Sequence, residues 1–387
     1  MDISYFDNAA TSWPKPGETE AAMARFLRES GGSPGRSGHR LSIAAGRVVL
    51  EAREAVAALL GADDPLRIVF TKNATEALNI VFRGMLTPDD HVITSSMEHN
   101  SVMRPLRALE AEGMALSVVP CSGLGELDPD RIRSAVRPNT KLLVLTHASN
   151  VTGTIFPITE AARIAHDHGI AVCIDAAQTA GALPIDVRGM GIDLLAFTGH
   201  KSLFGPPGTG GLFIAKGLED RIRPLMTGGT GSRSEFEAQP SFLPDKFEAG
   251  TPNTVGIAGL GASVSWIMGK GVGPIRAHEE ALTGRFISGL SRIPGITLYG
   301  PPDPSRRTAV VSFNIAGLTP SEAALELDER FAILSRPGLH CAPAAHRTIG
   351  TFPQGTLRFA FSFFNTPDQI DASLEAVARL SRGKQGG

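Results

Sequence analysis

Short runs of apolar residues recur along the first half of the chain and alternate with stretches in which apolar positions repeat every three to four residues. The first pattern predicts buried β-strands and the second predicts amphipathic helices, so their alternation indicates a mostly parallel sheet covered by helices. The apolar runs lie at residues 67–70, 91–94, 116–119, 141–145, 170–174, 194–197 and 212–214. We therefore predict an α/β fold with a large domain built on a mostly parallel seven-stranded sheet.

The spacing changes after residue 253, where the pattern becomes that of a smaller α+β domain. Helical patterns are found at 255–268 and 275–290, and further helices are predicted to begin at Pro320 and Pro367. Strands are predicted at 295–299, 309–313, 331–334 and 356–361. A chain of 387 residues suits two domains. We predict a large domain over residues 15–255 and a small domain formed by 1–14 together with 256–387.

Two segments, residues 31–40 and 227–244, are rich in Gly, Ser or other turn-forming residues and are predicted to be loops. We expect them to border a substrate entrance.

The composition excludes several classes of protein. The net charge is −2, so no basic face for nucleic acid is expected. An apolar stretch of about 18 residues is absent and the polar start lacks a signal-peptide pattern, so we expect no membrane segment and a cytoplasmic protein. The three cysteines, Cys121, Cys173 and Cys341, form no CxxC motif and no cluster of metal-ligand spacing, which predicts reduced thiols and no metal site.

A lysine and an aspartate supply the most specific chemical signal. Asp175 ends one predicted strand, and Lys201 follows the end of another in a Gly-rich turn, 26 positions later. Both side chains are then expected at the carboxyl edge of one sheet. Pyridoxal phosphate (PLP) requires an amine for covalent attachment and a carboxylate beside its ring nitrogen, and this pair matches both needs. The alternative is a solvated lysine and an aspartate that caps a helix.

Eight short blocks in order extend this signal along almost the whole chain. They are Tyr5–Thr11, Asn73–Leu78, Glu98–His99, Thr146–Asn150, Asp175–Gln178, Thr198–Lys201, Phe247–Asn253 and Arg336–Cys341. With them the chain resembles the class V branch of the fold-type I PLP enzymes, and within it the cysteine desulfurase and selenocysteine lyase group. Each block is weak alone, whereas their order is specific.

The resemblance implies which residues bind the cofactor. Ala74 and Thr75, at a predicted helix start, would bind the phosphate, with Thr198 and His200 completing the cradle. Thr251 would reach the phosphate from the second subunit of a homodimer. Alternatively, Thr75 is only a favourable first-turn residue and Thr251 only part of a turn.

Further roles concern the ring and the substrate. The resemblance implies that His99 stacks on the ring and moves protons, although a hydrogen-bonded histidine at a strand end is the alternative. Gln178 would donate to the ring's phenolic oxygen, and Asn150 lies at a strand end where substrate or cofactor passes. Arg358 matches the position that clamps the substrate carboxylate, with Arg36 and Arg336 as further candidates near the entrance. Otherwise Arg358 is a charge at a strand edge.

Cys341 distinguishes this reading from an ordinary aminotransferase. A thiolate there can attack the substrate sulfur, which leaves an enzyme persulfide and alanine. Gly338 offers flexibility, and His340 and Arg336 are nearby positive or proton-handling groups. The short segment resembles that of the group II desulfurases, with departures at Pro337 and in the continuation from His346 to Gly350. Cys173, in an apolar strand, is predicted to be a core residue and Cys121 an incidental loop thiol.

Together these observations predict a homodimeric PLP-dependent cysteine desulfurase. It converts L-cysteine to L-alanine and holds the sulfur on Cys341 for an acceptor protein, with Lys201 as the acid and base. A selenocysteine lyase that acts on L-selenocysteine is the nearest alternative. A transaminase or another PLP-dependent carbon–sulfur lyase needs no Cys341, and a PLP-binding regulator without turnover is the alternative outside the enzymes.

Overall fold

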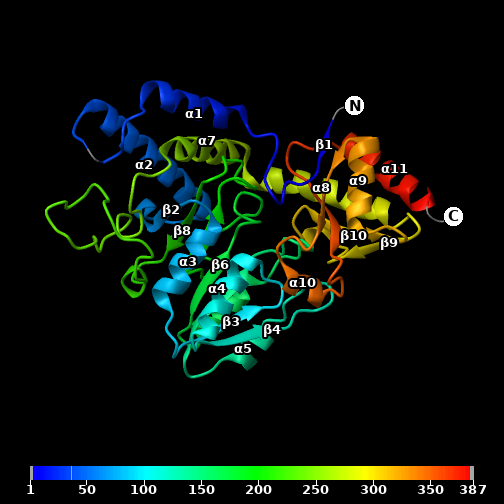
Figure 1. Cartoon of the computed structure of the whole chain (residues 1–387), viewed down its shortest axis with the longest axis horizontal. Helices are drawn as coiled ribbons and strands as arrows, with labels where there is room; N and C mark the ends of the chain where they lie inside the picture. The colour runs from blue at the N-terminus through cyan, green and yellow to red at the C-terminus, as the bar shows by residue number, and fades with distance from the viewer. Residues whose placement is uncertain (1–2, 36, 384–387) are drawn as a thin grey trace.

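The structure is a computed structural model that describes residues 3–35 and 37–383. Its centre is a seven-stranded sheet in the order β2-β8-β7-β6-β5-β3-β4 (Figure 1). Only β8 runs antiparallel to its neighbours, β2 and β7. The strands are β2 (Ile68–Thr71), β3 (His91–Ser95), β4 (Ala115–Val119), β5 (Thr140–Thr146), β6 (Ala171–Asp175), β7 (Leu194–Thr198) and β8 (Gly210–Ile214). The predicted α/β fold and its seven strands are therefore confirmed.

Helices cover both faces of this sheet, which explains why its strands are apolar throughout. Along β6, Val172 and Ile174 pack into one hydrophobic cluster while Ala171 and Cys173 pack into the other. Because successive side chains of a strand point to opposite faces, both faces must be apolar. Helices α3 (Ala74–Met85) and α4 (Asn100–Ala111) contribute to one cluster. The other receives α2 (Arg40–Leu60), α5 (Asp130–Ala135), α6 (Ile158–His166) and α7 (Thr254–Lys270).

A second, antiparallel sheet of four strands stands beside the first, in the order β12-β13-β10-β9. Its strands are β9 (Ile296–Tyr299), β10 (Val310–Ile315), β12 (Arg336–Gly338) and β13 (Thr356–Ala360). The helices of this part are α8 (Val272–Leu290), α9 (Pro320–Phe331), α10 (Pro343–Thr348) and α11 (Pro367–Gly383). Short 3-10 helices lie at Pro65–Arg67, Glu219–Arg221 and Pro304–Arg306.

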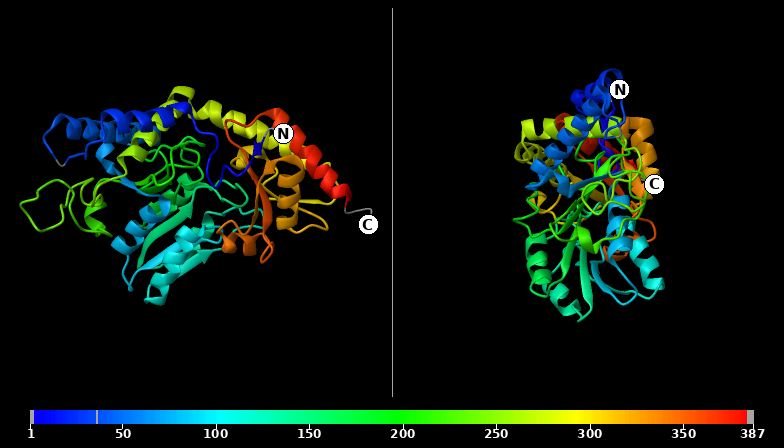
Figure 2. Two further views of the ribbon diagram at one scale, coloured as in Figure 1. Left: turned by 45° about the horizontal axis from the view of Figure 1, so that its top comes forward. Right: turned by 90° about the vertical axis from the view of Figure 1, so that its left-hand side faces the viewer.

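The N-terminal segment belongs structurally to this second part. Strand β1 (Ser4–Tyr5) pairs in parallel with β11 (Ile333–Leu334), and Asp7 forms an isolated bridge with Ala360. The chain then crosses to the large sheet, where α1 (Gly17–Glu29) packs on α7. Helices α7 and α8 lead back along the same side of the molecule (Figure 2). The domain boundaries at residues 15 and 255 stay a prediction.

One predicted strand is shorter than expected. The apolar run at 331–334 was expected to form a strand, but Phe331 ends α9 and Ala332 caps that helix in the left-handed conformation, with φ 53°. Only Ile333 and Leu334 are extended. The other three predicted strands of the small domain lie within two residues of their predicted limits, whereas β12 was not predicted. Within the described ranges no single helix is long and apolar enough to cross a bilayer, and only α7 and α8 taken together, with an 81° bend between them, reach that length and composition.

Candidate active site

A cavity of about 270 Å³ opens at the carboxyl ends of the central parallel strands, where α3 and α4 begin. This is the edge at which open α/β sheets bind ligands. The lining includes every predicted cofactor residue except Thr251: Ala74, Thr75, His99, Asn150, Asp175, Gln178, Thr198, His200 and Lys201. Asn73, Ser101, Thr146 and Ala177 complete it. Residues spread over 129 positions of sequence are thus brought together by the strand order.

Asp175 and Lys201 lie in this cavity on neighbouring parallel strands or just beyond them. The Asp175 carboxylate accepts hydrogen bonds from the Ala177 backbone N–H (2.9 Å) and from the Ser101 hydroxyl (3.3 Å). Burial raises the pKa of Asp175, so a cation placed against it would favour its ionised form. Burial also lowers the pKa of Lys201 to about 8, although Asp175 opposes that change. A useful fraction of the lysine is therefore a neutral amine near pH 7.

His99 is held by the first turn of α4. Its Nδ1 accepts the Ser101 backbone N–H at 3.0 Å and lies 2.8 Å from the Ser101 hydroxyl. A backbone N–H can only donate, so the neutral ring carries its proton on Nε2. Burial, reinforced by the charge of Lys201, lowers the pKa of His99 to about 3 and keeps the ring neutral. Ser101 thus links His99 to Asp175, a role that sequence reasoning missed because a serine two residues after a helix cap carries no distinctive signal.

The far end of the cavity suits a phosphate. The Asn73 side chain caps α3 by accepting the Glu76 N–H at 2.9 Å, so the helix begins at Ala74 and Thr75, where the N–H groups have no acceptor within the helix. The Thr198 hydroxyl is buried and has no hydrogen-bond partner among the described residues. With Asp175 for the ring nitrogen and Lys201 for the aldehyde, these groups fit PLP. The orphaned hydroxyl is the observation that argues most directly for a missing polar ligand.

The N-terminal segment is hydrogen-bonded to two residues of the cavity lining, His200 and Gln178. The backbone carbonyl of His200, one residue before Lys201, accepts from the Ser12 N–H at 2.9 Å and the Thr11 hydroxyl at 3.1 Å. The Ser12 hydroxyl (3.2 Å) and the Lys15 ammonium (3.3 Å) also point at it. Gln178 donates to the Ala9 carbonyl at 3.0 Å, which leaves its second amide hydrogen for the cavity. These contacts fix the peptide that carries Lys201.

Arg358 is buried beside the cavity residue Asn150 and forms a charge cluster with Asp7. Its guanidinium donates to the Asn150 carbonyl (2.9 Å) and to the Asp7 carboxylate (2.8 Å), while its Nε is buried without a partner in the described part of the chain. Arg336 stands directly opposite Arg358 in the β12–β13 pair. The Asp7 carboxylate pairs with Arg358, and the Arg358 Nε has no partner among the described residues, so the cluster can accept a second anion. Sequence reasoning found both arginines and missed Asp7.

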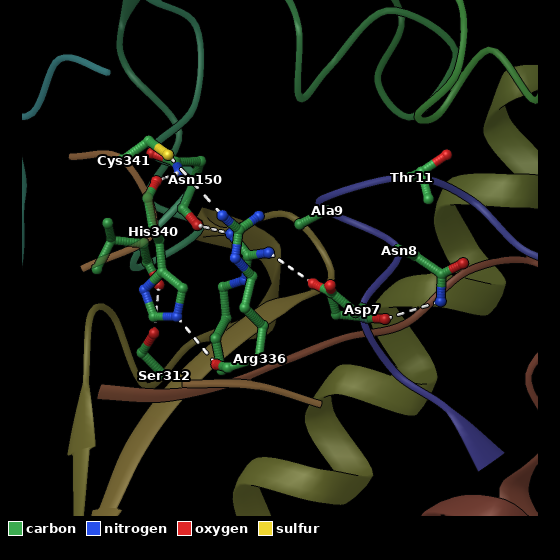
Figure 3. Close-up of polar contacts among 12 residues, drawn as sticks. Asp7, Asn8, Ala9, Thr11, Asn150, Ser312, Arg336, His340 and Cys341 are labelled. Atoms are coloured by element: carbon green, nitrogen blue, oxygen red, sulfur yellow. Dashed lines mark hydrogen bonds and ion pairs between the residues drawn. The ribbon is translucent and has the colours of Figure 1, made fainter. Parts of the chain in front are cut away.

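Cys341 is the exposed thiol of the structure, and its Sγ lies 3.8 Å from Nη2 of Arg336 (Figure 3). Its carbonyl accepts the Asn100 N–H at the start of α4 (2.8 Å), so the thiol segment is tied to the helix that follows His99. Cys173 is fully buried, as expected. Cys121 is half-buried, and burial raises its pKa to about 11.

Arg336 and His340, the two residues predicted to assist Cys341, make different contacts. Arg336 contacts the sulfur, whereas the imidazole of His340 is buried and hydrogen-bonds to the Arg336 carbonyl at 3.0 Å. Asn150 donates its side-chain amide to the His340 carbonyl at 2.7 Å. Asn150 therefore joins the arginine cluster to the thiol segment.

Two predicted residues lie elsewhere. Thr251 is exposed and lines a second cavity of about 290 Å³ together with Thr71, Lys72 and Glu76, on the other side of the turn that leads into α3. Arg36 lies outside the described residues.

Comparisons with known proteins agree with this geometry. The chain matches the Aminotransferase class-V family over residues 4–372. A probable cysteine desulfurase of Methanothermobacter thermautotrophicus is 37% identical over 98% of this chain and 95% of its own length. A cysteine desulfurase of Escherichia coli is 32% identical over 99% of this chain and 94% of its own. The apo structure of the cysteine desulfurase from Thermococcus onnurineus NA1 superposes with a TM-score of 0.92 at 34% identity and covers 98% of this chain and 95% of that one.

Proposed function

The chain belongs to the class V aminotransferase family, with cysteine desulfurases as relatives over nearly its full length, and from this premise we propose that it is a PLP-dependent cysteine desulfurase. It converts L-cysteine to L-alanine and leaves the sulfur as a persulfide on Cys341. The observation that carries the proposal is the exposed thiol of Cys341, held 3.8 Å from an arginine beside a cavity that contains Lys201 and Asp175.

The substrate is oriented by the arginine cluster. The carboxylate of L-cysteine binds the Arg358 guanidinium, where the buried Nε lacks a protein partner among the described residues. Asp7 and the Asn150 carbonyl hold the other edge of that guanidinium and fix its plane. A bidentate arginine orients a carboxylate better than a lysine would, because both N–H bonds point in one plane.

Ala74, Thr75, Thr198 and His200 would hold the phosphate of PLP, and Asp175 would pair with its ring nitrogen. The cofactor would supply an electron sink for the bonds at the substrate Cα. Lys201 takes the proton from Cα and returns it to Cβ. Neutral His99, with its proton on Nε2, faces the same cavity and can donate to the substrate or receive a proton in turn.

Cys341 carries out the sulfur transfer. Nη2 of Arg336 lies 3.8 Å from Sγ of Cys341, and the thiolate of Cys341 attacks the sulfur of L-cysteine. The bond between Cβ and sulfur breaks as the new sulfur–sulfur bond forms, and Cβ gains a proton. One L-cysteine and one thiol thus become one L-alanine and one persulfide, without an external oxidant or reductant.

We further propose a homodimer and a sulfur-acceptor protein. The position of Thr251, exposed on the far side of the turn before α3, supports a model in which this residue serves the phosphate site of a second subunit. The exposure of Cys341 supports direct transfer of its sulfur to an acceptor thiol.

The test is a single-turnover incubation of the PLP-loaded enzyme with L-cysteine. We expect stoichiometric L-alanine and the gain of one sulfur atom on the peptide that contains Cys341, both measured by mass spectrometry. Cys341→Ser should bind PLP normally and form neither product. Alanine formation by that variant at the wild-type rate would refute the persulfide step, and alanine formation from L-selenocysteine alone would identify a selenocysteine lyase.

A further inference from the structure

The backbone at the thiol segment adopts a conformation that its residues do not favour. His340 and Cys341 have φ values of 49° and 57°, so both lie in the left-handed region. For residues with a Cβ atom, this region costs about 1 to 2 kcal/mol each, and the surrounding structure must supply the contacts that hold them. The side chain of His340 makes those contacts, because it is only 3% exposed.

A relay of two imidazoles holds this ring in one orientation. Nε2 of His340 lies 3.0 Å from the Arg336 carbonyl, which can only accept, so Nε2 carries the proton and Nδ1 is an acceptor (Figure 3). Nδ1 of His340 faces Nε2 of His346 at 3.3 Å, so His346 donates there. Nδ1 of His346 then accepts from the Thr351 hydroxyl at 2.7 Å. Every proton of the relay is assigned by its neighbours, from Thr351 to His346 to His340 to Arg336.

Both rings remain neutral in this arrangement. His346 is fully buried, and burial, with the charge of Arg358, lowers its pKa to about 4. Burial also lowers the pKa of His340 well below its ordinary value. Both rings are neutral and their nitrogens are hydrogen-bonded to one another, to Arg336 and to Thr351. The two histidines therefore act on the thiol segment by fixing the orientation of the His340 ring.

The relay ends at the residue that activates the thiol. His340 binds the backbone of Arg336, and the guanidinium of the same residue contacts Sγ of Cys341. Within the proposed function, we infer that His346 is a positioning residue for the sulfur transfer. By holding the His340 ring, it keeps Cys341 in its left-handed conformation and Arg336 against the sulfur.

The experiment places amide side chains of two different lengths at position 346. In His346→Gln, the side-chain NH₂ can occupy the place of Nε2 and donate to His340. In His346→Asn, the shorter side chain reaches only the place of Nδ1, near Thr351. We expect His346→Asn to slow both persulfide formation and the alkylation of Cys341 by iodoacetamide by about tenfold or more, because small displacements of reacting groups are costly. His346→Gln should stay within about threefold of the wild type in both measurements.

A matched control separates positioning from general loss of stability. His91 is also buried and hydrogen-bonded on both ring nitrogens, to Thr140 (2.7 Å) and Ser117 (2.8 Å), but it lies at the opposite end of β3. His91→Asn should lower the melting temperature and leave the alkylation rate of Cys341 unchanged. Covalent attachment of PLP to Lys201 should be the same in all variants.

The outcomes are distinguishable. Equal alkylation rates for His346→Asn and His346→Gln, or a His91→Asn effect of the same size, would overturn the inference. If His346→Asn does not fold, Thr351→Val replaces it, because loss of the hydroxyl frees the His346 tautomer, and a wild-type alkylation rate in Thr351→Val would then overturn it. If the wild type makes no alanine from L-cysteine, the proposed function fails, while the alkylation rates still decide the positioning role.

Discussion

Replacement of Asp7 by asparagine tests the buried charge cluster that orients Arg358. The side chain of Arg358 is 1% exposed and that of Asp7 is 23% exposed, and their closest atoms are 2.8 Å apart. Removal of one partner from such a pair costs about 3 to 5 kcal/mol, and the partial exposure of Asp7 places this case near 3 kcal/mol. An unfolding entropy of about 2.1 cal/mol/K per residue corresponds to roughly 0.8 kcal/mol/K for 387 residues. The melting temperature of Asp7→Asn should therefore fall by about 4 °C.

The same change should strengthen the response to a carboxylate ligand. In Asp7→Asn, Arg358 loses its carboxylate partner and still feels the neighbouring positive charge of Arg336. L-alanine should then raise the melting temperature of the variant by more than it raises that of the wild type, because its carboxylate restores the missing charge. Differential scanning calorimetry with and without L-alanine measures both effects.

A control and a refuting result are available. The exposed pair Arg83–Glu112 has side-chain exposures of 36% and 53%, so Glu112→Gln should cost only about 0.2 to 1 kcal/mol and respond to L-alanine like the wild type. If Asp7→Asn melts within 1 °C of the wild type, or if L-alanine stabilises both equally, the cluster does not work as described.

Three further predictions follow from the same site and its surroundings. Within the proposed function the neutral amine of Lys201 reacts with PLP, so attachment of the cofactor to the apo-enzyme should speed up with rising pH and level off above about pH 8, the pKa to which burial lowers this lysine. A rate that does not change between pH 6 and 9 would contradict this. Glu279 is a buried residue of α8, and burial raises its pKa from 4.5 to about 8. The folded protein therefore holds a proton that the unfolded chain releases, and stability falls as the pH rises from about 4.5 to 8. Glu279→Gln should raise the melting temperature at pH 8 more than at pH 5, and an equal gain at both would refute the assignment. Mixed dimers of Lys201→Ala and Thr251→Asp chains should regain activity in one of their two sites, whereas no recovery would mean that Thr251 acts within its own chain.

The strands of the large sheet could be predicted because burial on both faces leaves an unmistakable apolar run. The same rule failed at residues 331–334, where the apolar residues serve first the last turn of α9 and then a two-residue strand. A short apolar run does not distinguish these environments, and only the left-handed Ala332 separates them.

Some residues of the candidate site could also be predicted from the sequence, and others could not. Residues such as Asp175 and Lys201 could be predicted because strand ends meet at one edge of a parallel sheet and because their chemistry is specific. Asp7 could not, since its partner Arg358 is 351 residues away and nothing near Asp7 indicates a buried cation. His346 gave a sequence signal only as a departure from the family pattern, and its role depends on a contact with His340 that the turn before α10 creates.

The pairing of residues 4–7 with β11 and β13 has a consequence for biosynthesis. Ser4, Tyr5 and Asp7 pair with Ile333, Leu334 and Ala360, so these residues have no strand partner until more than 300 further residues have left the ribosome. Contacts of such sequence separation form late and slowly. The large sheet can assemble earlier. The His200 carbonyl, however, lacks these hydrogen bonds until residues 11–15 pack against it. The site proposed to hold the cofactor is therefore complete only once residues 11–15 have packed against the peptide before Lys201.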